Sequence, residues 1–403
     1  MANTSVQFTI KIVPAILTIN GGSSSLKFAI FATGHGKPQR TVSGEIERIG
    51  LPNPTLRVGS SRRPVKVQNH AEALALVLEQ INETPGAKDL SAVAHRVVHG
   101  GPLYRQHQPV NAAMLAELER LSPFDPEHLP ADISLIRCCT EAFPAVPQFA
   151  CFDTAFHRDL PRVAYLLPIP RKYEKRGIRR YGFHGLSCSW LMQQLKERAG
   201  EEAARGRVVI AHLGNGASMT AVHNGRSVDT TMSFTPTAGL VMSRRTGDLD
   251  PSLAAYLIRI EKMSVDDFQH MVNAESGLLG ISETSSDMRD LLDAQQNDAR
   301  AADAVDSFCY NAKKHLAGLA AVLGGLDTLI FSAGIGENNA EVRARICHGL
   351  EFLGIELDSI ANNQNGAIIS KKTSKATVHV IKTDEEMYIA QTITALLRNE
   401  VTS

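Results

Sequence analysis

Two stretches of the chain share one pattern, in which hydrophobic, β-rich runs flank a polar turn that is rich in glycine. The first covers residues 16–31 (ILTINGGSSSLKFAIF), and the second covers residues 208–222 (VVIAHLGNGASMTAV). Each stretch predicts a β-hairpin. Glycines in such a turn let backbone N–H groups come close to an anion, and serine hydroxyls add further donors. An ordinary polar hairpin explains the first stretch equally well, but its repetition half a chain later indicates two related domains that hold a nucleotide between them.

The rest of the hydrophobic pattern predicts both helices and strands. Apolar positions at helical spacing predict helices over residues 71–82, 111–121, 131–143, 186–198 and 306–323, and a last helix that begins at residues 383–386. β-rich runs predict strands over residues 90–99, 148–152, 326–333 and 378–381, with further strands and turns between residues 41 and 63. Residues 122–130 are interrupted by prolines and predict a loop.

Length and composition narrow the class of protein. At 403 residues the chain is too long for one ordinary core, so two domains are expected. Its formal net charge is zero, which gives no reason to expect a nucleic-acid or membrane partner. Its six cysteines show no C-x-x-C spacing, no apolar run approaches the roughly 20 residues of a membrane helix, and residues 1–13 lack the features of a secretory signal. These features predict a reduced, cytoplasmic protein.

The predicted strand over residues 90–99 carries a first set of candidate side chains. His95 and His99 lie four positions apart, which on a helix is metal-ligand spacing, but the β-branched content and the glycines that follow favour a strand. On a strand, Arg96 and Val98 share one face. A guanidinium beside an apolar surface suits a small carboxylate with a short alkyl tail. An edge arginine paired with a surface acid is the comparable alternative.

Three other segments carry candidate chemistry at the ends of predicted elements. Asp153 follows the strand over residues 148–152, and the carboxyl end of such a strand is where α/β sheets place reactive groups. His184 stands between glycines at the start of a helix, where it can meet an anion. Asp250, followed by Pro251, is the expected N-cap of a helix. Glu385 and its neighbours are also explained by a helix cap alone.

Several familiar motifs are absent or misleading. Residues 157–160 read HRDL, as in the catalytic loop of protein kinases, but the other kinase motifs are missing, so we interpret the match as coincidence. No G-x-x-x-x-G-K-[ST] occurs, which excludes the P-loop class. The GIGENN segment at residues 334–339 is a weak dinucleotide signal. The basic run over residues 171–180 is interpreted as a solvated face rather than a nucleic-acid patch.

Six motifs in order resemble those of one family. INGGSSSLK, YGFHG, HLGNGAS, RTGDLDP, FSAGIGEN and TDEE, taken together, resemble the acetate kinase family from about residue 16 to the terminal helix. The resemblance implies an α/β fold with two duplicated ribonuclease-H-like or actin-like ATPase domains around an interdomain cleft. It implies domains at residues 1–155 with 384–403 and at residues 156–383, and a homodimer.

The resemblance also implies an activity and its central residues. The family phosphorylates acetate to acetyl phosphate with Mg-ATP, reversibly and by direct in-line transfer. A propionate or other short-chain acid kinase, or a sugar or polyol kinase of the same fold, are the alternatives. The residues that resemble the catalytic set are Asp153, His184 and Arg245. Asn20 and Glu385 resemble the residues around Mg²⁺, which Mn²⁺ can replace.

The remaining implied residues bind the two substrates. Arg96, Val98 and His128 are expected to surround the carboxylate. Glu127 departs from the family pattern beside this pocket, and its charge would repel a carboxylate unless the side chain points away. The residues expected to bind ATP or ADP are Lys27, His212, Leu213, Gly214, Asn215, Gly216, Asp287, Met288, Arg289, Gly334, Ile335, Gly336, Glu337 and Asn338.

Overall fold

The computed structural model describes residues 15–22, 24–34, 36–82 and 89–401, and the chain divides into two compact units. Unit 1 comprises Met1–Gly100, Gln106–Phe152 and Glu385–Ser403, and unit 2 comprises Gly101–Arg105 and Asp153–Asp384. Residues 1–13, for which no secretory signal is expected, and Ser23 of the first turn lie outside the described residues.

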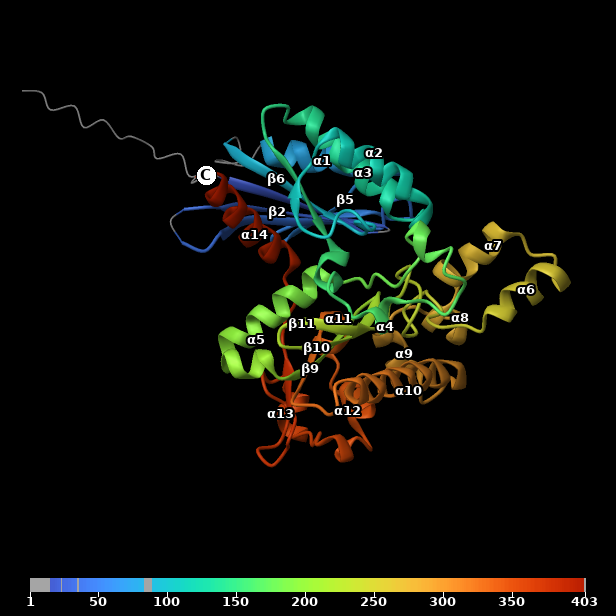
Figure 1. Ribbon diagram of the computed structural model, residues 1–403. Coiled ribbons are helices and arrows are strands. Elements are labelled where there is room, and N and C mark those ends of the chain that lie inside the picture. The colour runs from blue at the N-terminus through green and yellow to red at the C-terminus, as the bar shows by residue number, and fades with distance from the viewer. Residues whose placement is uncertain (1–14, 23, 35, 83–88, 402–403) are drawn as a thin grey trace, which may run out of the picture. The chain divides into compact units, whose positions relative to one another are not determined.

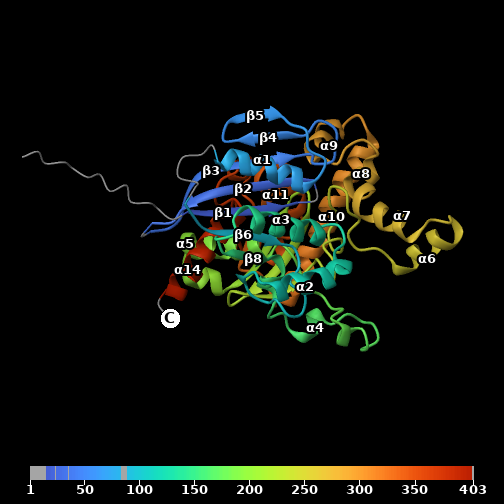
Figure 2. The same cartoon turned by 90° about the horizontal axis from the view of Figure 1, so that it is seen from above.

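Unit 1 is built on one eight-stranded sheet in the order β5-β4-β3-β2-β1-β6-β8-β7. Most of this order can be followed in Figure 2. Strands β1 to β5 form an antiparallel meander, whereas β6 pairs in parallel with both β1 and β8. The strands are β1 (Ala15–Gly21), β2 (Ser25–Ala32), β3 (Gln39–Glu47), β4 (Thr55–Val58), β5 (Ser61–Pro64), β6 (Leu90–Val97), β7 (Gln108–Pro109) and β8 (Gln148–Phe152).

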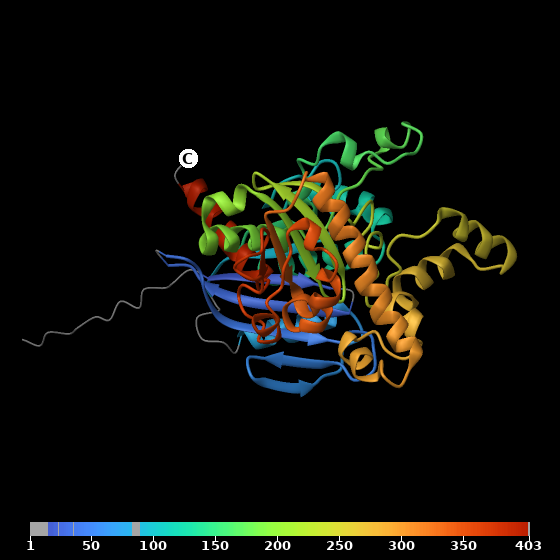
Figure 3. The same ribbon diagram turned by 90° about the horizontal axis from the view of Figure 1, so that it is seen from below.

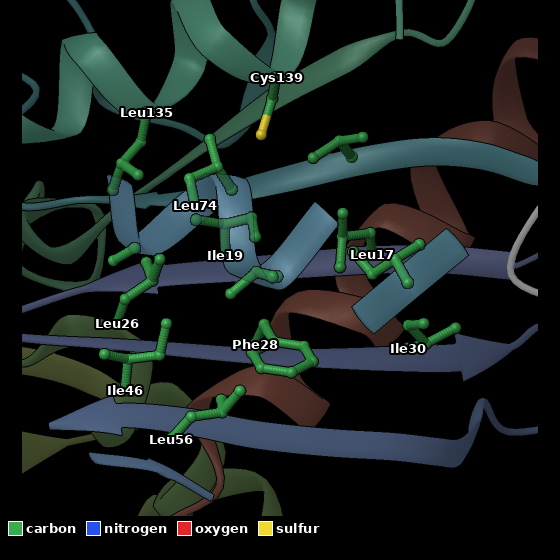
Figure 4. Close-up of a cluster of buried hydrophobic side chains, with 14 of the residues drawn as sticks. Leu17, Ile19, Leu26, Phe28, Ile30, Ile46, Leu56, Leu74, Leu135 and Cys139 are labelled. Atoms are coloured by element: carbon green, nitrogen blue, oxygen red, sulfur yellow. The ribbon is translucent and has the colours of Figure 1, made fainter. Parts of the chain in front are cut away.

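Helices cover both faces of this sheet, as Figure 1 shows. On one side lie α1 (His70–Asn82), α2 (Ala112–Leu121) and α3 (Leu129–Ala142), with a short turn η1 (Ser122–Phe124) before α3; on the other lies α14 (Glu385–Val401). Alternating strand residues such as Ile19 and Phe28 point toward Leu74 of α1 and Leu135 of α3, as Figure 4 shows. Residues of the opposite phase, including Phe31, pack against α14. A two-sided core explains why the strands read as nearly continuous apolar runs.

Unit 2 contains a five-stranded sheet in the order β11-β10-β9-β12-β13. Its strands are β9 (Arg207–Leu213), β10 (Ala217–His223), β11 (Arg226–Thr230), β12 (Thr328–Ser332) and β13 (Thr377–Val380). The helix α5 (Gly185–Arg205) packs its Leu191 and Leu195 against this sheet. The long helix α10 (Ala299–Val322), orange in Figure 3, contacts β9 and β10 on the other side.

Shorter elements connect these parts of unit 2. They are η2 (Asp153–His157), α4 (Arg162–Tyr165), η3 (Glu174–Arg176), α6 (Pro251–Ile260), α7 (Val265–His270), η4 (Met271–Glu275), α8 (Gly277–Ser282), α9 (Met288–Ala294), α11 (Ala333–Asn338), α12 (Ala340–Cys347), η5 (Glu351–Leu353) and α13 (Ser359–Asn363).

The two sheets repeat one topology. In unit 1 the hairpin β1–β2 is followed outward by antiparallel β3, and β6 and β8 continue the sheet in parallel on the other side of β1. In unit 2 the hairpin β9–β10 is followed by antiparallel β11, and β12 and β13 continue in parallel. The two predicted hairpins therefore occupy equivalent positions, and the predicted duplication is confirmed.

The predicted elements are present, with differences at their ends that have local causes. The helix predicted over residues 306–323 begins earlier, because Asp298 accepts a hydrogen bond from the Arg300 N–H as its N-cap. The strand predicted over residues 90–99 ends at Val97. The expected Asp250 N-cap with Pro251 at the first helical position is confirmed. In the basic run over residues 171–180, the lysines and arginines at positions 171, 172, 175 and 176 are exposed. Arg179 and Arg180 are half-buried, so the prediction of a solvated face is wrong there.

The cysteine side chains are mostly buried. All six are free thiols, and all but Cys138 are buried. Burial raises the pKa of Cys139, Cys309 and Cys347 to about 12, which keeps these thiols protonated and unreactive near neutral pH. Over the described part of the chain, no helix combines the length and apolar character needed to cross a membrane.

Candidate active site

The first hairpin places Asn20 beside the start of α14. Asn20 pairs in register with Lys27 on β2, so both side chains point to the face that α14 covers. The amide Nδ2 of Asn20 donates to Glu385 Oε2 at 3.1 Å and to Glu386 Oε1 at 3.2 Å. These carboxylates open α14, where the helix N-terminus favours negative charge. Two residues 365 positions apart, Asn20 and Glu385, are thus brought together.

Lys27 completes this group with an opposite charge. Its Nζ lies 4.0 Å from a carboxylate oxygen of Glu45, and about half of its side chain is exposed. Partial burial acts to lower the pKa of Lys27, but the charges of Glu386, Glu45 and Glu385 outweigh it and raise the pKa above its ordinary value. The lysine is therefore fully charged near neutral pH, inside an acidic surrounding that would also attract a metal cation.

The oxygen donors of this group fit Mg²⁺. Asn20 and Glu385 offer the amide and carboxylate oxygens that hard cations prefer. Within the described ranges, no group of three or more His, Cys, Asp or Glu side chains could hold a metal ion by itself. Two protein ligands are sufficient for Mg²⁺ when water and phosphate oxygens supply the others, which is its usual arrangement in phosphate-transferring enzymes.

Arg96 and Val98 lie at the carboxyl end of β6, but not on one strand face as predicted. Arg96 is on the strand, and its Nη1 donates to the carbonyl oxygen of Gly21 at 2.8 Å. Val98 lies just beyond the strand and is buried. Its backbone N–H donates to Oδ2 of Asp132 at 2.9 Å. Asp132 is a buried acid in the first turn of α3, and the sequence analysis missed it.

The helix α3 comes very close to Gly21. A Cβ atom at Gly21 would lie 2.9 Å from Cδ1 of Leu135 and 3.4 Å from Oδ1 of Asp132. Gly21 thus allows the helix that carries Asp132 to approach the end of β1.

His128 is held by an acid three residues before it. Its Nδ1 lies 2.9 Å from Oδ1 of Asp125, which also accepts the His128 backbone N–H at 3.2 Å. Both side chains are buried, whereas Glu127 is exposed. The charge of Glu127 is therefore exposed to solvent rather than buried beside His128.

The metal interpretation of His95 and His99 is wrong. Both residues are buried, and neither belongs to a metal-binding group among the described residues. Nε2 of His95 lies 2.8 Å from Oε1 of Gln148, and burial lowers the pKa of His95 to about 4. The ring of His99 packs edge-on against Phe124 with the centroids 5.9 Å apart. These histidines are core residues.

In unit 2, Asp153 and the start of α5 are packed together. Asp153 opens the turn η2 directly after β8 and is buried. A Cβ atom at Gly185, the first residue of α5, would lie 2.0 Å from the carbonyl oxygen of Asp153. Only glycine allows such an approach. His184 precedes this glycine with a left-handed φ of 57°, which turns the chain into the helix.

His184 is supported by a hydrogen-bonded and stacked group. Its ring stacks on His212 with centroids 4.2 Å apart, and its Nδ1 lies 2.9 Å from Oγ of Ser218. His212 and Ser218 are register partners in the β9–β10 hairpin. Oγ of Ser187 lies 2.8 Å from both His212 Nδ1 and Thr383 Oγ1. His212, which was expected to bind the nucleotide, therefore orients the ring of His184. Ser187 and Ser218, which hold these rings, were not predicted as site residues.

Arg245 and His184 meet at the glycine turn of the second hairpin. A Cβ atom at Gly216 would lie 3.3 Å from Nε2 of His184 and 3.8 Å from Nη1 of Arg245. The segment before Arg245 is tied to the same turn, because Ser243 donates from its backbone N–H to Asn215 O at 3.2 Å and from Oγ to Asn215 Oδ1 at 3.3 Å. Two of the three expected catalytic residues thus converge here.

Residues 334–338 form the short helix α11 directly after β12. A Cβ atom at Gly214 would lie 3.4 Å from the Ala333 side chain and 3.9 Å from the backbone nitrogen of Gly334, so the two glycine-rich segments are neighbours. Oε1 of Glu337 accepts the backbone N–H groups of Ala333 at 2.8 Å and Thr383 at 2.9 Å. Its carboxylate therefore braces α11, and Gly334 and Asn338 remain exposed.

Some expected nucleotide residues have structural roles for their side chains. Leu213 and Met288 are buried in the core, so only their backbone could reach a ligand. Asp287 caps α9 by accepting the Arg289 N–H at 2.9 Å, and it pairs with the Arg289 guanidinium at 2.5 Å. This hydrogen-bonded pairing holds the pKa of Asp287 below its ordinary value. Arg289 is exposed, and Ile335 is half-buried.

Comparisons with known proteins identify the family of this chain. The sequence profile of the acetokinase family matches residues 15–391. An acetate kinase of Clostridium botulinum is 41% identical over 398 residues, which are 95% of this chain and all of that protein. The crystal structure of Porphyromonas gingivalis acetate kinase superimposes with a TM-score of 0.85 at 33% identity, covering 95% of this chain and 100% of the other.

A second solved structure carries a different substrate name. A propionate kinase from Francisella tularensis superimposes with a TM-score of 0.87 at 36% identity, covering 94% of this chain and 98% of the other. These similarities confirm the predicted fold class, because each extends over nearly the full length of both chains.

Proposed function

Because this chain belongs to the acetokinase family, we propose that it transfers the γ-phosphoryl group of ATP reversibly to acetate. The family membership makes it a phosphotransferase that uses a carboxyl group as acceptor. The products in this direction are acetyl phosphate and ADP. The observation that carries the proposal is the convergence of His184 and Arg245 at Gly216, where both can neutralise charge on a phosphoryl group.

We assign the substrate carboxylate to Arg96 in unit 1. A guanidinium can offer a carboxylate two parallel N–H donors. Val98 is buried just beyond the end of β6, and His128 is buried directly before α3; these two residues are the candidates for the acyl pocket. A carboxylate is already ionised near neutral pH because such groups titrate at about pH 4–5. It needs no general base, so Asp153 acts by position.

The nucleotide is assigned to residues 212–216, 287–289 and 334–338 of unit 2. The backbone of the glycine-rich turn and the exposed residues of α11 supply donors for phosphate and nucleoside. Lys27 adds a positive charge for the phosphates. As the phosphoryl group crosses in line, Arg245 and His184 stabilise the charge on its equatorial oxygens.

Asn20 and Glu385 are the residues that would hold Mg²⁺, or Mn²⁺ in its place. When bound, the ion would neutralise negative charge on the phosphate oxygens. The hydrogen bond between the Asn20 amide and Glu385 keeps both side chains in position for this role.

Two alternatives concern the acceptor. The similarity to the Francisella tularensis propionate kinase makes propionate the first alternative to acetate. The choice between the two acids depends on the size of the pocket around Val98. A sugar or polyol kinase would need a base to take a hydroxyl proton, and Asp153 could serve as that base.

A hydroxylamine-trapping assay tests the proposal. The purified chain is incubated with Mg-ATP and acetate, propionate, butyrate or glycerol, and acyl phosphate is trapped as the hydroxamate. We expect product with the acids, most efficiently with acetate. ADP release that depends on glycerol and yields no hydroxamate would instead assign the chain to the polyol kinases.

Two variants separate the assigned roles. Arg245→Ala should lower kcat by about two orders of magnitude, because one preorganised donor contributes roughly 3 kcal/mol to the transition state. Arg96→Ala should mainly raise the KM for acetate. An unchanged kcat in the first variant, or a rise only in the KM for ATP in the second, would contradict these assignments.

The assembly and location of the protein follow from the same family. We propose a homodimer in the cytoplasm. Sedimentation of the purified chain at micromolar concentration tests the homodimer, and a monomer in this experiment would contradict it.

A further inference from the structure

Unit 2 contains a small hollow, open to solvent, whose wall includes three arginines, Arg105, Arg158 and Arg179. Tyr181, Thr154 and His157 also line it. None of these residues belongs to the site proposed above. The hollow is lined by residues from two segments that the proposed function leaves unused, the HRDL segment and the second half of the basic run.

Arg179 forms no direct ion pair with a described acid, although the charge of Glu174 acts on it from nearby. The residue is half-buried, and its guanidinium lies over the rings of Tyr165 and Tyr181, 4.2 and 5.2 Å from their centroids. Its Nε donates to the carbonyl oxygen of Arg180 at 3.2 Å, and no ion pair joins Arg179 to an acid in the described part of unit 2. Burial lowers the pKa of Arg179, and this outweighs the opposite effects of Tyr181, Tyr165 and Glu174, while the charge of Arg105 acts in the same direction as burial.

Arg105 and Arg158 share a single acid. Asp159 lies 3.7 Å from Nη2 of Arg105 and 3.6 Å from Nε of Arg158, both longer than a direct hydrogen bond. The next acid, Glu174, is engaged in a two-point pair with Arg162 at 2.6 and 2.9 Å. Three arginines therefore line the hollow, and two of them share one loosely held carboxylate. Nη2 of Arg105 also donates to the carbonyl oxygen of Arg158 at 2.5 Å, which holds this guanidinium at the wall.

His157 adds no charge to this wall near neutral pH. Its Nε2 lies 2.9 Å from the carbonyl oxygen of Phe183, to which it donates, and its Nδ1 lies 2.8 Å from Oγ of Ser227. Burial lowers the pKa of His157 to about 4. The excess positive charge of the hollow comes from the arginines alone.

We propose that this hollow binds a small dianion, either an organic dicarboxylate or a phosphate group, that bridges the arginines. Guanidinium groups bind carboxylate and phosphate oxygens with paired N–H donors, and partly buried pairs of this kind are stronger than exposed ones. The ring of Tyr181 gives the wall an apolar part beside which a short carbon chain can lie. A monocarboxylate such as acetate cannot satisfy more than one guanidinium bidentately, so it should bind poorly.

The hollow is backed by the two segments that carry candidate catalytic residues. Thr154 directly follows Asp153, and Tyr181 lies three residues before His184. His157 connects the segments through its hydrogen bond to Phe183. A test must therefore distinguish an anion in the hollow from an anion in the proposed active site.

Isothermal titration of the full chain with succinate, inorganic phosphate and acetate tests the proposal. The double variant Arg105→Gln/Arg158→Gln removes two guanidinium groups that are about half exposed, so the fold should be preserved. The double variant Arg171→Gln/Arg176→Gln removes the same charge from exposed positions outside the hollow, and is the matched control. Arg245→Ala reports on the active site.

We expect succinate or phosphate to bind the hollow with a stoichiometry of one per chain, and acetate to bind the hollow at least about tenfold more weakly. Binding of acetate at Arg96, its proposed site, should be the same in the double variant Arg105→Gln/Arg158→Gln as in the unmodified chain. In the double variant Arg105→Gln/Arg158→Gln, the Kd for the dianion should rise by roughly tenfold for each lost guanidinium. In the control double variant and in Arg245→Ala, the Kd should stay within about twofold of its value in the unmodified chain. Tighter binding of succinate would identify a dicarboxylate site, and tighter binding of phosphate a phosphoryl site. No binding up to ~10 mM, equal binding by the two double variants, or loss of binding in Arg245→Ala would overturn the proposal.

Discussion

Arg343 is a buried guanidinium whose removal should loosen the nucleotide half of the site. The residue lies on α12, is fully buried, and makes five hydrogen bonds. Its Nη1 donates to the carbonyl oxygens of Gly336 at 2.9 Å and Glu337 at 3.1 Å. Its Nε and Nη2 bind Oδ1 and O of Asn362, and Nη2 also binds Oδ1 of Asn365. The acceptors are all neutral oxygens.

The size of the effect follows from this count. Taking roughly 1 kcal/mol as the net contribution of one hydrogen bond, the five bonds together contribute about 5 kcal/mol. Burial opposes this, since it lowers the pKa of Arg343 to about 10 and therefore disfavours the charged form. We expect Arg343→Met to cost about 2–4 kcal/mol of unfolding free energy. In a domain of about 150–250 residues this lowers the melting temperature by roughly 4–16 °C.

The assay combines thermal melting with steady-state kinetics. Because the carbonyl groups of Gly336 and Glu337 lose their anchor, Arg343→Met should raise the KM for ATP by about tenfold, without an equal rise in the KM for the carboxylate. Arg343→Lys keeps the charge but has only three donors, so its melting temperature and its KM for ATP should lie between those of the unmodified chain and those of Arg343→Met. Arg345→Met, on the same helix but partly exposed and ion-paired with Asp306, is the matched control and should change little. A melting temperature for Arg343→Met equal to that of this control would refute the reasoning.

Two further predictions concern the catalytic glycine turn and the buried histidines. Gly216→Ala places a Cβ 3.3 Å from Nε2 of His184, so it should lower kcat about tenfold with little loss of stability. Gly318→Ala, with no atom within 4 Å of its new Cβ, is the control and should leave both kcat and stability nearly unchanged. Equal kcat values in the two variants would contradict this prediction. Acidification from pH 6.5 to about 4 should destabilise the fold by roughly 1 kcal/mol per pH unit for each of His95 and His157, because burial lowers the pKa of each to about 4 and the unfolded chain binds more protons in this range. Melting temperatures that stay constant over this range would exclude the effect.

Local sequence pattern determined the hairpins and the elements around them. Residues such as Ile19 and Phe28 alternate with residues of the opposite phase, and a short glycine turn connects them, so the pairing of Asn20 with Lys27 needs only neighbouring residues. Strand and helix periods and caps such as Asp250 are likewise local properties. Even the partner of His128 lies only three residues away, at Asp125, and a search for acids at that spacing would have found it.

Only the tertiary structure decided which distant side chains support those local elements. The contact of Asn20 with Glu385, the bond from Val98 to Asp132 and the anchoring of Gly336 by Arg343 join segments whose approach depends on how helices pack on sheets. The prediction that Val98 shares a strand face with Arg96 is also wrong, because β6 ends at Val97, one residue before Val98. Hydrogen bonds are short-ranged and directional, so their partners are set by packing distances that a linear pattern of polar and apolar residues does not contain.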